Sequence, residues 1–215
     1  MGQKVHPHGL RLGIIYNWSS RWFFSNKRAY RESIFEDAKI REELMKKYSF
    51  AGVIDIVIER AIKKITVLIY SVKPGMIIGR GGKGLEEVKK IIVSNIKSYK
   101  NEKQKEARVE LKIEPVKKPY THAYYVAQSI AEKLVRNFPH RAVVHSTMQR
   151  VIEAGARGVR IQLGGRIAGA EISRREKYFQ GTIPNSTIRE RVEFAKYPAL
   201  TKSGYVGVKV WICQN

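Results

Sequence analysis

Apolar residues recur at every second position in the first half of the chain. Branched apolar side chains alternate with polar ones over 53–59 and 64–70, and again over 107–114, which is the period of a half-buried strand. Asn26 can cap a helix whose expected apolar face holds Tyr30, Ile34, Ala38 and Met45. The predicted elements of this half are a helix at 27–47, strands at 53–59 and 64–70, a short helix at 74–79, a helix at 83–97 and a strand at 107–114.

The second half begins after a segment rich in proline and lysine. Pro115 and Pro119 enclose two lysines without periodicity, which is typical of a boundary between domains. Helices with an apolar stripe are predicted at 120–136 and 140–154, separated at Pro139. Strands are predicted at 158–164, 169–178, 187–195 and 205–213, the last with Val206, Val208, Val210 and Ile212 on one face.

The pattern predicts an α+β protein with two domains. The expected order is α-β-β-α-α-β in the first and α-α-β-β-β-β in the second. We expect an N-terminal segment at 1–26, a first domain at 27–116 and a second at 117–215.

The charge of the chain points to a polyanionic partner. Its 215 residues include 41 Lys and Arg against 19 Asp and Glu, a formal charge of +22. Each of the first four blocks of fifty residues holds nine or ten basic and four or five acidic residues, so the charge belongs to the folded body and not to a tail. Broad contact with nucleic acid phosphates explains such a surface better than mere solubility does.

The sequence lacks features that several classes of protein require. No apolar stretch is long enough for a membrane-spanning helix, and the beginning has no signal-peptide pattern. Cys213 is a lone cysteine, so neither an internal disulfide nor a four-thiolate zinc site is possible. No grouped catalytic set can be placed, so we expect neither enzymatic activity nor a cofactor or metal.

A glycine-rich loop at 79–84 allows three interpretations. Gly79, Gly81 and Gly84 match the spacing of a dinucleotide-binding loop, but six residues separate them from the preceding strand, where that fingerprint requires an immediate turn. Alternatively, Ile78 to Gly82 read as the I-G-x-x-G loop of a KH domain, with Arg80 and Lys83 directed at phosphates. In the third interpretation, the glycines only begin a helix and bind no ligand. The element order and the charge favour the KH domain, with Gly79, Arg80, Gly81, Gly82 and Lys83 as candidate RNA-binding residues.

Three further segments carry a family resemblance that spans the chain. They are GQKVHPHGLRLG at 2–13, GRIAGAEISR at 165–174 and GYVGVKVWI at 204–212. With the glycine loop they resemble the universal family of small-subunit ribosomal protein three, in its bacterial form, whose first domain is a type II KH domain.

The resemblance implies a structural protein of the small-subunit head that binds ribosomal RNA and lines the channel through which messenger RNA enters. It implies the ribosome of a bacterial cytoplasm, with an organellar ribosome as the alternative. The implied neighbours are the small-subunit proteins numbered ten and fourteen and, at the channel, those numbered four and five. The implied ribosomal RNA contacts are Lys4, His6, Arg11, Arg166, Arg174 and Arg175. The less favoured alternative for each arginine is a solvated surface charge, and for His6 with His8 it is an incomplete metal site.

The messenger channel is where the sequence departs from the family. The family pattern has two adjacent arginines and a lysine, which align with Arg141, Ala142 and His145 of this chain. One cation is therefore kept, one is lost and one becomes a mostly neutral histidine. The candidate channel residues are Arg136, Arg141, His145 and Arg150, with His140 nearby. A different function, that of a free KH-type RNA chaperone or regulatory factor, would use the glycine loop alone.

Overall fold

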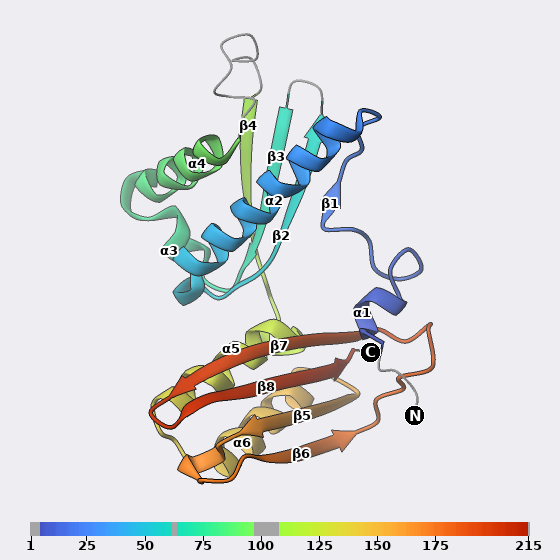
Figure 1. The fold of residues 1–215 in the computed structure, drawn as a ribbon, viewed down its shortest axis with the longest axis vertical. Coiled ribbons are helices and arrows are strands. Elements are labelled where there is room, and N and C mark those ends of the chain that lie inside the picture. Colours follow the sequence, from blue (N-terminus) through green and yellow to red (C-terminus); the bar gives the residue numbers. More distant parts are fainter. Residues whose placement is uncertain (1–4, 62–63, 97–107, 215) are drawn as a thin grey trace. The chain divides into compact units, whose positions relative to one another are not determined.

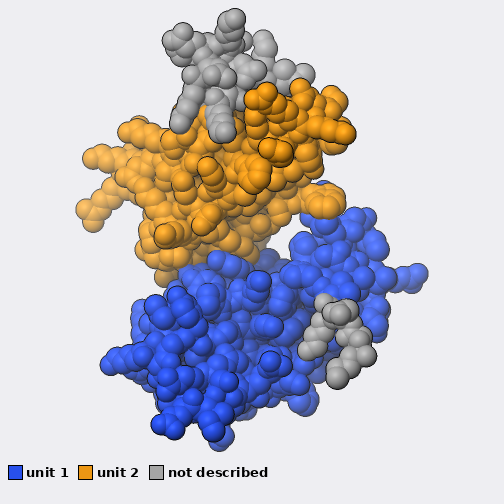
Figure 2. Space-filling view, viewed as in Figure 1, with its two compact units in different colours: residues 1–17, 118–215 blue, residues 18–117 orange. Residues whose placement is uncertain are grey.

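The computed structural model describes residues 5–61, 64–96 and 108–214, which form two compact units. One unit comprises 18–117 and the other combines 1–17 with 118–215 (Figure 2). In this division, residues 5–17 group with the C-terminal unit and residues 18–26 with the other. Among the described residues, no helix has the length and apolar character needed to cross a bilayer.

The unit at 18–117 is a four-stranded sheet with helices packed on one face (Figure 1). The strands β1 (Ser20–Arg21), β2 (Val53–Ala61), β3 (Lys64–Ser71) and β4 (Arg108–Pro115) lie in the order β1-β2-β3-β4. Only β2 and β3 are antiparallel. The helices are α2 (Lys27–Lys47), α3 (Pro74–Ile78) and α4 (Lys83–Asn95). The predicted α-β-β-α-α-β order is confirmed, and the sequence missed the two-residue β1.

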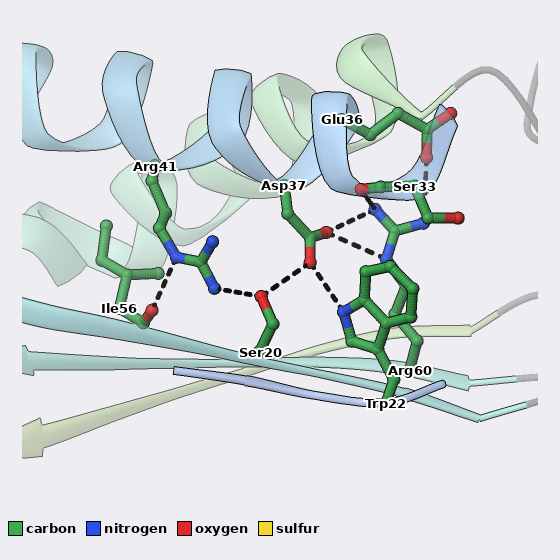
Figure 3. Close-up of polar contacts among 8 residues, drawn as sticks. All are labelled: Ser20, Trp22, Ser33, Glu36, Asp37, Arg41, Ile56 and Arg60. Atoms are coloured by element: carbon green, nitrogen blue, oxygen red, sulfur yellow. Dashed lines mark hydrogen bonds and ion pairs between the residues drawn. The ribbon is translucent and has the colours of Figure 1, made fainter. Parts of the chain in front are cut away.

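The buried face of α2 differs from the expected one. Tyr30 and Ile34 are exposed, and the buried positions are Ser33, Glu36, Asp37, Ile40 and Leu44. Burial of two carboxylates is costly unless each meets a partner. Both do, because β2 supplies an arginine directly beneath them (Figure 3).

Asp37 is the centre of this polar cluster. Its carboxylate accepts hydrogen bonds from the indole nitrogen of Trp22 at 2.7 Å, from Ser20 at 3.2 Å and from Nε of Arg60 at 2.9 Å. Arg60 also pairs with Glu36 at 2.9 Å and lies over the Trp22 ring. The cluster therefore joins the β1 segment, α2 and β2.

The C-terminal unit has two helices packed on one face of an antiparallel sheet (Figure 1). Helices α5 (Ala123–Val135) and α6 (His140–Glu153) precede strands β5 (Gly158–Gly165), β6 (Arg174–Gly181), β7 (Val192–Thr201) and β8 (Gly204–Cys213), and α1 (Pro7–Leu10) joins this unit. The strand order is β6-β5-β8-β7. The valines of β8 face the helices and are buried as predicted, and the α-α-β-β-β-β order is confirmed.

Two strands begin about five residues later than the sequence predicted. The strand expected at 169–178 is β6, and the one expected at 187–195 is β7, which continues through Pro198. A proline inside a run normally argues against a strand, but β7 lies at the edge of the sheet, where the missing N–H breaks no ladder bond. The hydrophobic pattern alone could not show which strands are edges.

Replacing Asp37 with alanine tests the buried cluster. Because Arg60 would keep a buried charge without its main partner, we expect the free energy of unfolding to fall by about 3–5 kcal/mol. Urea denaturation of the full chain, with hydrogen exchange on α2 and β2 peptides, measures the loss. Glu59→Ala removes the exposed pair with Arg21 and should cost about 1 kcal/mol or less. Equal effects of the two variants would contradict a structural role for the cluster.

Candidate nucleic-acid interface

The glycine loop joins α3 to α4 and exposes its two cations. Gly79, Gly81 and Gly82 all have positive φ, at 68°, 63° and 78°, which side chains other than glycine adopt rarely. Arg80 and Lys83 are exposed on either side of this turn. The loop thus presents bare backbone between two positive side chains at the beginning of α4, an arrangement suited to phosphate.

A fourth glycine sets how closely the two helices meet. A Cβ placed on Gly84 would lie 2.1 Å from the carbonyl oxygen of Ile77 and 2.9 Å from that of Ile78. Only glycine therefore allows the first turn of α4 to pass against the end of α3. This contact, rather than a requirement for a dinucleotide, explains the third glycine of the G-x-G-x-x-G spacing.

Arg11 does not occupy the surface position that was expected of an RNA contact. Its side chain is fully buried, and its guanidinium donates hydrogen bonds to the carbonyl oxygens of Glu190 at 2.7 Å and Pro7 at 3.1 Å. It donates three more, at 2.9 to 3.2 Å, to carbonyls of the 184–187 segment. The expected contact of Arg11 with ribosomal RNA is corrected: the residue fastens the N-terminal segment to the loop between β6 and β7.

The other N-terminal candidates differ in their placement. Lys4 lies outside the described residues. His6 is exposed and caps α1 through a hydrogen bond from the backbone nitrogen of Gly9 at 3.4 Å. Partial desolvation of its ring is the main cause that lowers the pKa of His6, and the charges of His8 and Lys196 act in the same direction. In the described part of the chain, no group of three His, Cys, Asp or Glu is placed to hold a metal ion.

The three arginines of the 165–175 segment are exposed. Arg166 donates to the carbonyl oxygens of Ala170 at 2.8 Å and Ser203 at 3.3 Å, which holds the turn after β5. Arg174 donates to Glu176 at 2.8 Å. Arg175 points outward opposite Gly164 of β5.

A hollow of about 1050 Å³ brings several of these candidates together on the C-terminal sheet. Its lining includes His6, Arg174 and Arg175. The sequence analysis missed four other lining residues, which are Arg160, Phe194, Lys209 and Trp211. For Lys209 and Trp211 the signal was present in β8, where the positions between the buried valines must face outward. Arg160 on β5 and Phe194 on β7 could not be placed beside them without the strand order.

The channel candidates on α6 do not form one cluster. Arg141 and His145 lie beside Tyr178 of β6: Arg141 interacts with the Tyr178 hydroxyl, and the His145 ring packs edge-on at 5.8 Å. Arg150 instead donates to the hydroxyl of Tyr120 at 3.0 Å. Arg136 is exposed at the end of α5. Only Arg141 and His145 therefore share a surface.

The neighbours of Arg141 include a carboxylate with its own partners. A hydrogen bond from Tyr178 at 2.6 Å is the main cause that lowers the pKa of Glu176, and Arg174 and His140 act in the same direction. Burial raises the pKa of Tyr178. Glu176 is thus ionised and held by its neighbours, so it neutralises part of the positive charge beside α6.

Comparison with known proteins covers nearly the whole chain. Residues 39–121 match the family described as KH domain, and residues 130–212 match Ribosomal protein S3, C-terminal domain. The small ribosomal subunit protein uS3 of Clostridium novyi (strain NT) is 42% identical over 212 residues, covering 99% of this chain and 92% of the relative.

Relatives from other bacteria show a similar identity over nearly the whole chain. The uS3 protein of Helicobacter pylori (strain J99) is also 42% identical, over 99% of this chain and 86% of the relative. That of Persephonella marina is 40% identical over 214 residues, covering 99% and 89%. The chain therefore belongs to the uS3 family of small ribosomal subunit proteins, with an N-terminal KH domain and the S3 C-terminal domain.

Proposed function

We propose that this protein is a structural, non-enzymatic constituent of the small-subunit head that binds small-subunit ribosomal RNA and lines the channel through which messenger RNA enters. The observation that carries the RNA-binding part is the glycine loop, with exposed Arg80 and Lys83 around a bare turn at the beginning of α4. Family membership and the surplus of basic residues along the whole chain support the ribosomal setting.

The proposed ribosomal RNA contacts outside the loop are the exposed cations of the C-terminal unit. Arg166, Arg174 and Arg175 remain candidates because their side chains reach solvent, and His6 because it lines the same hollow as the last two. Lys4 stays a prediction from the sequence. The proteins numbered ten and fourteen, and four and five at the channel, are the proposed neighbours.

The messenger part of the proposal rests on the exposed surface of α6. Arg141 and His145 are neighbours four residues apart, so both can meet one strand of RNA. A neutral histidine attracts phosphate less than a lysine does. We propose a channel role that is weaker in opening structured messages than a fully cationic helix would allow.

The glycine loop is tested with a matched pair of variants at Gly81. Its φ of 63° and ψ of 20° strain any side chain, but Asn and Asp adopt this region more readily than most residues and to a similar degree. A new Cβ there meets nothing within 4 Å. Gly81→Asp adds a negative charge at the phosphate site, and the affinity of the chain for a short single-stranded RNA should fall about tenfold or more. The affinity of the Gly81→Asn variant for the same RNA should stay near that of the unaltered chain. If both variants bind as tightly as the unaltered chain, the loop is not the main site.

The channel role is tested by changing the charge on α6. Ribosomes carrying Arg141→Ala should slow down on messages with stable hairpins more than on unstructured ones, because fewer cations hold the opened strand. His145→Lys should have the opposite effect. Lys202→Ala, which removes an exposed cation from the turn between β7 and β8, is the control. Translation rates on paired reporter messages are the measurement, and equal slowing on both would exclude the channel role.

A further inference from the structure

The face of the C-terminal sheet that points away from α5 and α6 carries its side chains in rows across all four strands. The registers place in one row Phe194 of β7, Trp211 of β8, Arg160 of β5 and Phe179 of β6. The next row holds Lys196, Lys209, Gln162 and Lys177, and the third holds Pro198, Gly207, Gly164 and Arg175. An aromatic row thus lies beside a row of lysines.

The charge of this face has one sign. In the described strands β5 to β8, none of the residues on the outward side is acidic, whereas five are basic. The nearest carboxylates of these strands, Glu176 and Glu193, lie on the opposite side and have partners there: Tyr178 and Arg174 for the first, and Gln214 for the second. The lysines of the second row form no ion pair within the described chain. The face is complementary to a polyanion.

The aromatic row is open to solvent at Phe179 and half-buried at Phe194 and Trp211, where the His6 ring packs on Phe194 with centroids 4.9 Å apart. Phe179 exposes 78% of its surface. Trp211 and Phe194 lie with their ring centroids 4.9 Å apart in the lining of the hollow, and the Arg160 guanidinium is 5.2 Å from the Trp211 ring centroid. Aromatic rings and arginine planes are the groups on which unpaired bases stack.

Two glycines leave the floor of the hollow bare. A Cβ at Gly164 would meet nothing within 4 Å, and one at Gly207 would make only an ordinary contact at 3.7 Å. Neither position has a positive φ, so neither packing nor backbone geometry demands glycine there. Their absent side chains allow another backbone to approach the sheet closely.

We infer that this outward face is a stacking platform for unpaired RNA nucleotides, with bases on the aromatic row and phosphates on the adjoining lysines. The inference deepens the proposed ribosomal RNA binding and rests on it. A second copy of the chain is a poor occupant, because two such faces repel each other. A duplex presents phosphates but no free bases, so it would use the lysines and leave the aromatic row uncovered.

The experiment compares two RNA probes of equal charge. One is a single-stranded octanucleotide with bases and the other is the same length of abasic backbone. Both are measured by fluorescence anisotropy with the full chain carrying Gly81→Asp, so that the glycine loop does not act as a second site. This chain should bind the probe with bases more tightly. Trp211→Ala should lower that affinity at least about fivefold while leaving the abasic probe unchanged, because stacking contributes through the base alone. Trp211→Phe should retain most of it.

Three further variants keep the result interpretable. Phe179→Ala changes an exposed ring without disturbing the core, so its loss of base-dependent binding cannot be a folding defect. Lys209→Ala should weaken both probes and lower the salt slope by about one. Phe138→Ala, which removes an exposed ring between α5 and α6, should change neither.

Two outcomes would overturn the platform. In the first, the abasic probe or a duplex binds as tightly as the probe with bases, which would show that the face is an electrostatic surface only. In the second, Trp211→Ala and Phe179→Ala both leave base-dependent binding unchanged. In both cases the proposed ribosomal function survives if the variants still join the small subunit. Failure of the unaltered chain to join small subunits would instead contradict the proposed function itself.

Discussion

Repulsion among 41 basic side chains is the constraint that the rest of the structure has to satisfy. The fold meets it by giving many of its few carboxylates partners within the chain. Asp37 and Glu36 are buried against Arg60, and Glu176 is held by Tyr178 and Arg174. Acidic groups therefore stabilise the two units internally, whereas the uncompensated cations remain on surfaces where an RNA can neutralise them.

The two units provide such surfaces by different means. In the KH domain, glycines make a short turn whose backbone is bare and whose flanking side chains are positive, and Gly84 lets α4 begin directly against α3. In the C-terminal unit, α5 and α6 cover one face of an antiparallel sheet, and the other face holds an open hollow beside the N-terminal segment. In the three rows described, the outward positions of that face are aromatic, basic or glycine apart from Gln162 and Pro198. One surface suits phosphates, and the other suits phosphates and bases together.

Element order could be predicted from the sequence because each helix and strand has a clear period, and the family could be identified from three short segments and the loop. The sequence predictions that were wrong or incomplete depended on contacts between residues distant in the chain. The apolar stripe through Tyr30 and Ile34 concealed that α2 buries Asp37, which requires Arg60 on β2. Arg11 looked like a surface cation because its acceptors, backbone carbonyls near 184–190, leave no trace in side-chain patterns. The row through Trp211 needed the strand order.

Sedimentation of a cell lysate, followed by mapping of RNA–protein cross-links in the small-subunit fraction, tests the central claim most directly. The account predicts that the protein travels with the small subunit at moderate salt and leaves it only at high salt, because many phosphate contacts hold it. Cross-links to small-subunit ribosomal RNA should include peptides of the C-terminal sheet. A protein found wholly in the soluble fraction at low salt would contradict the account and favour a free KH-type factor.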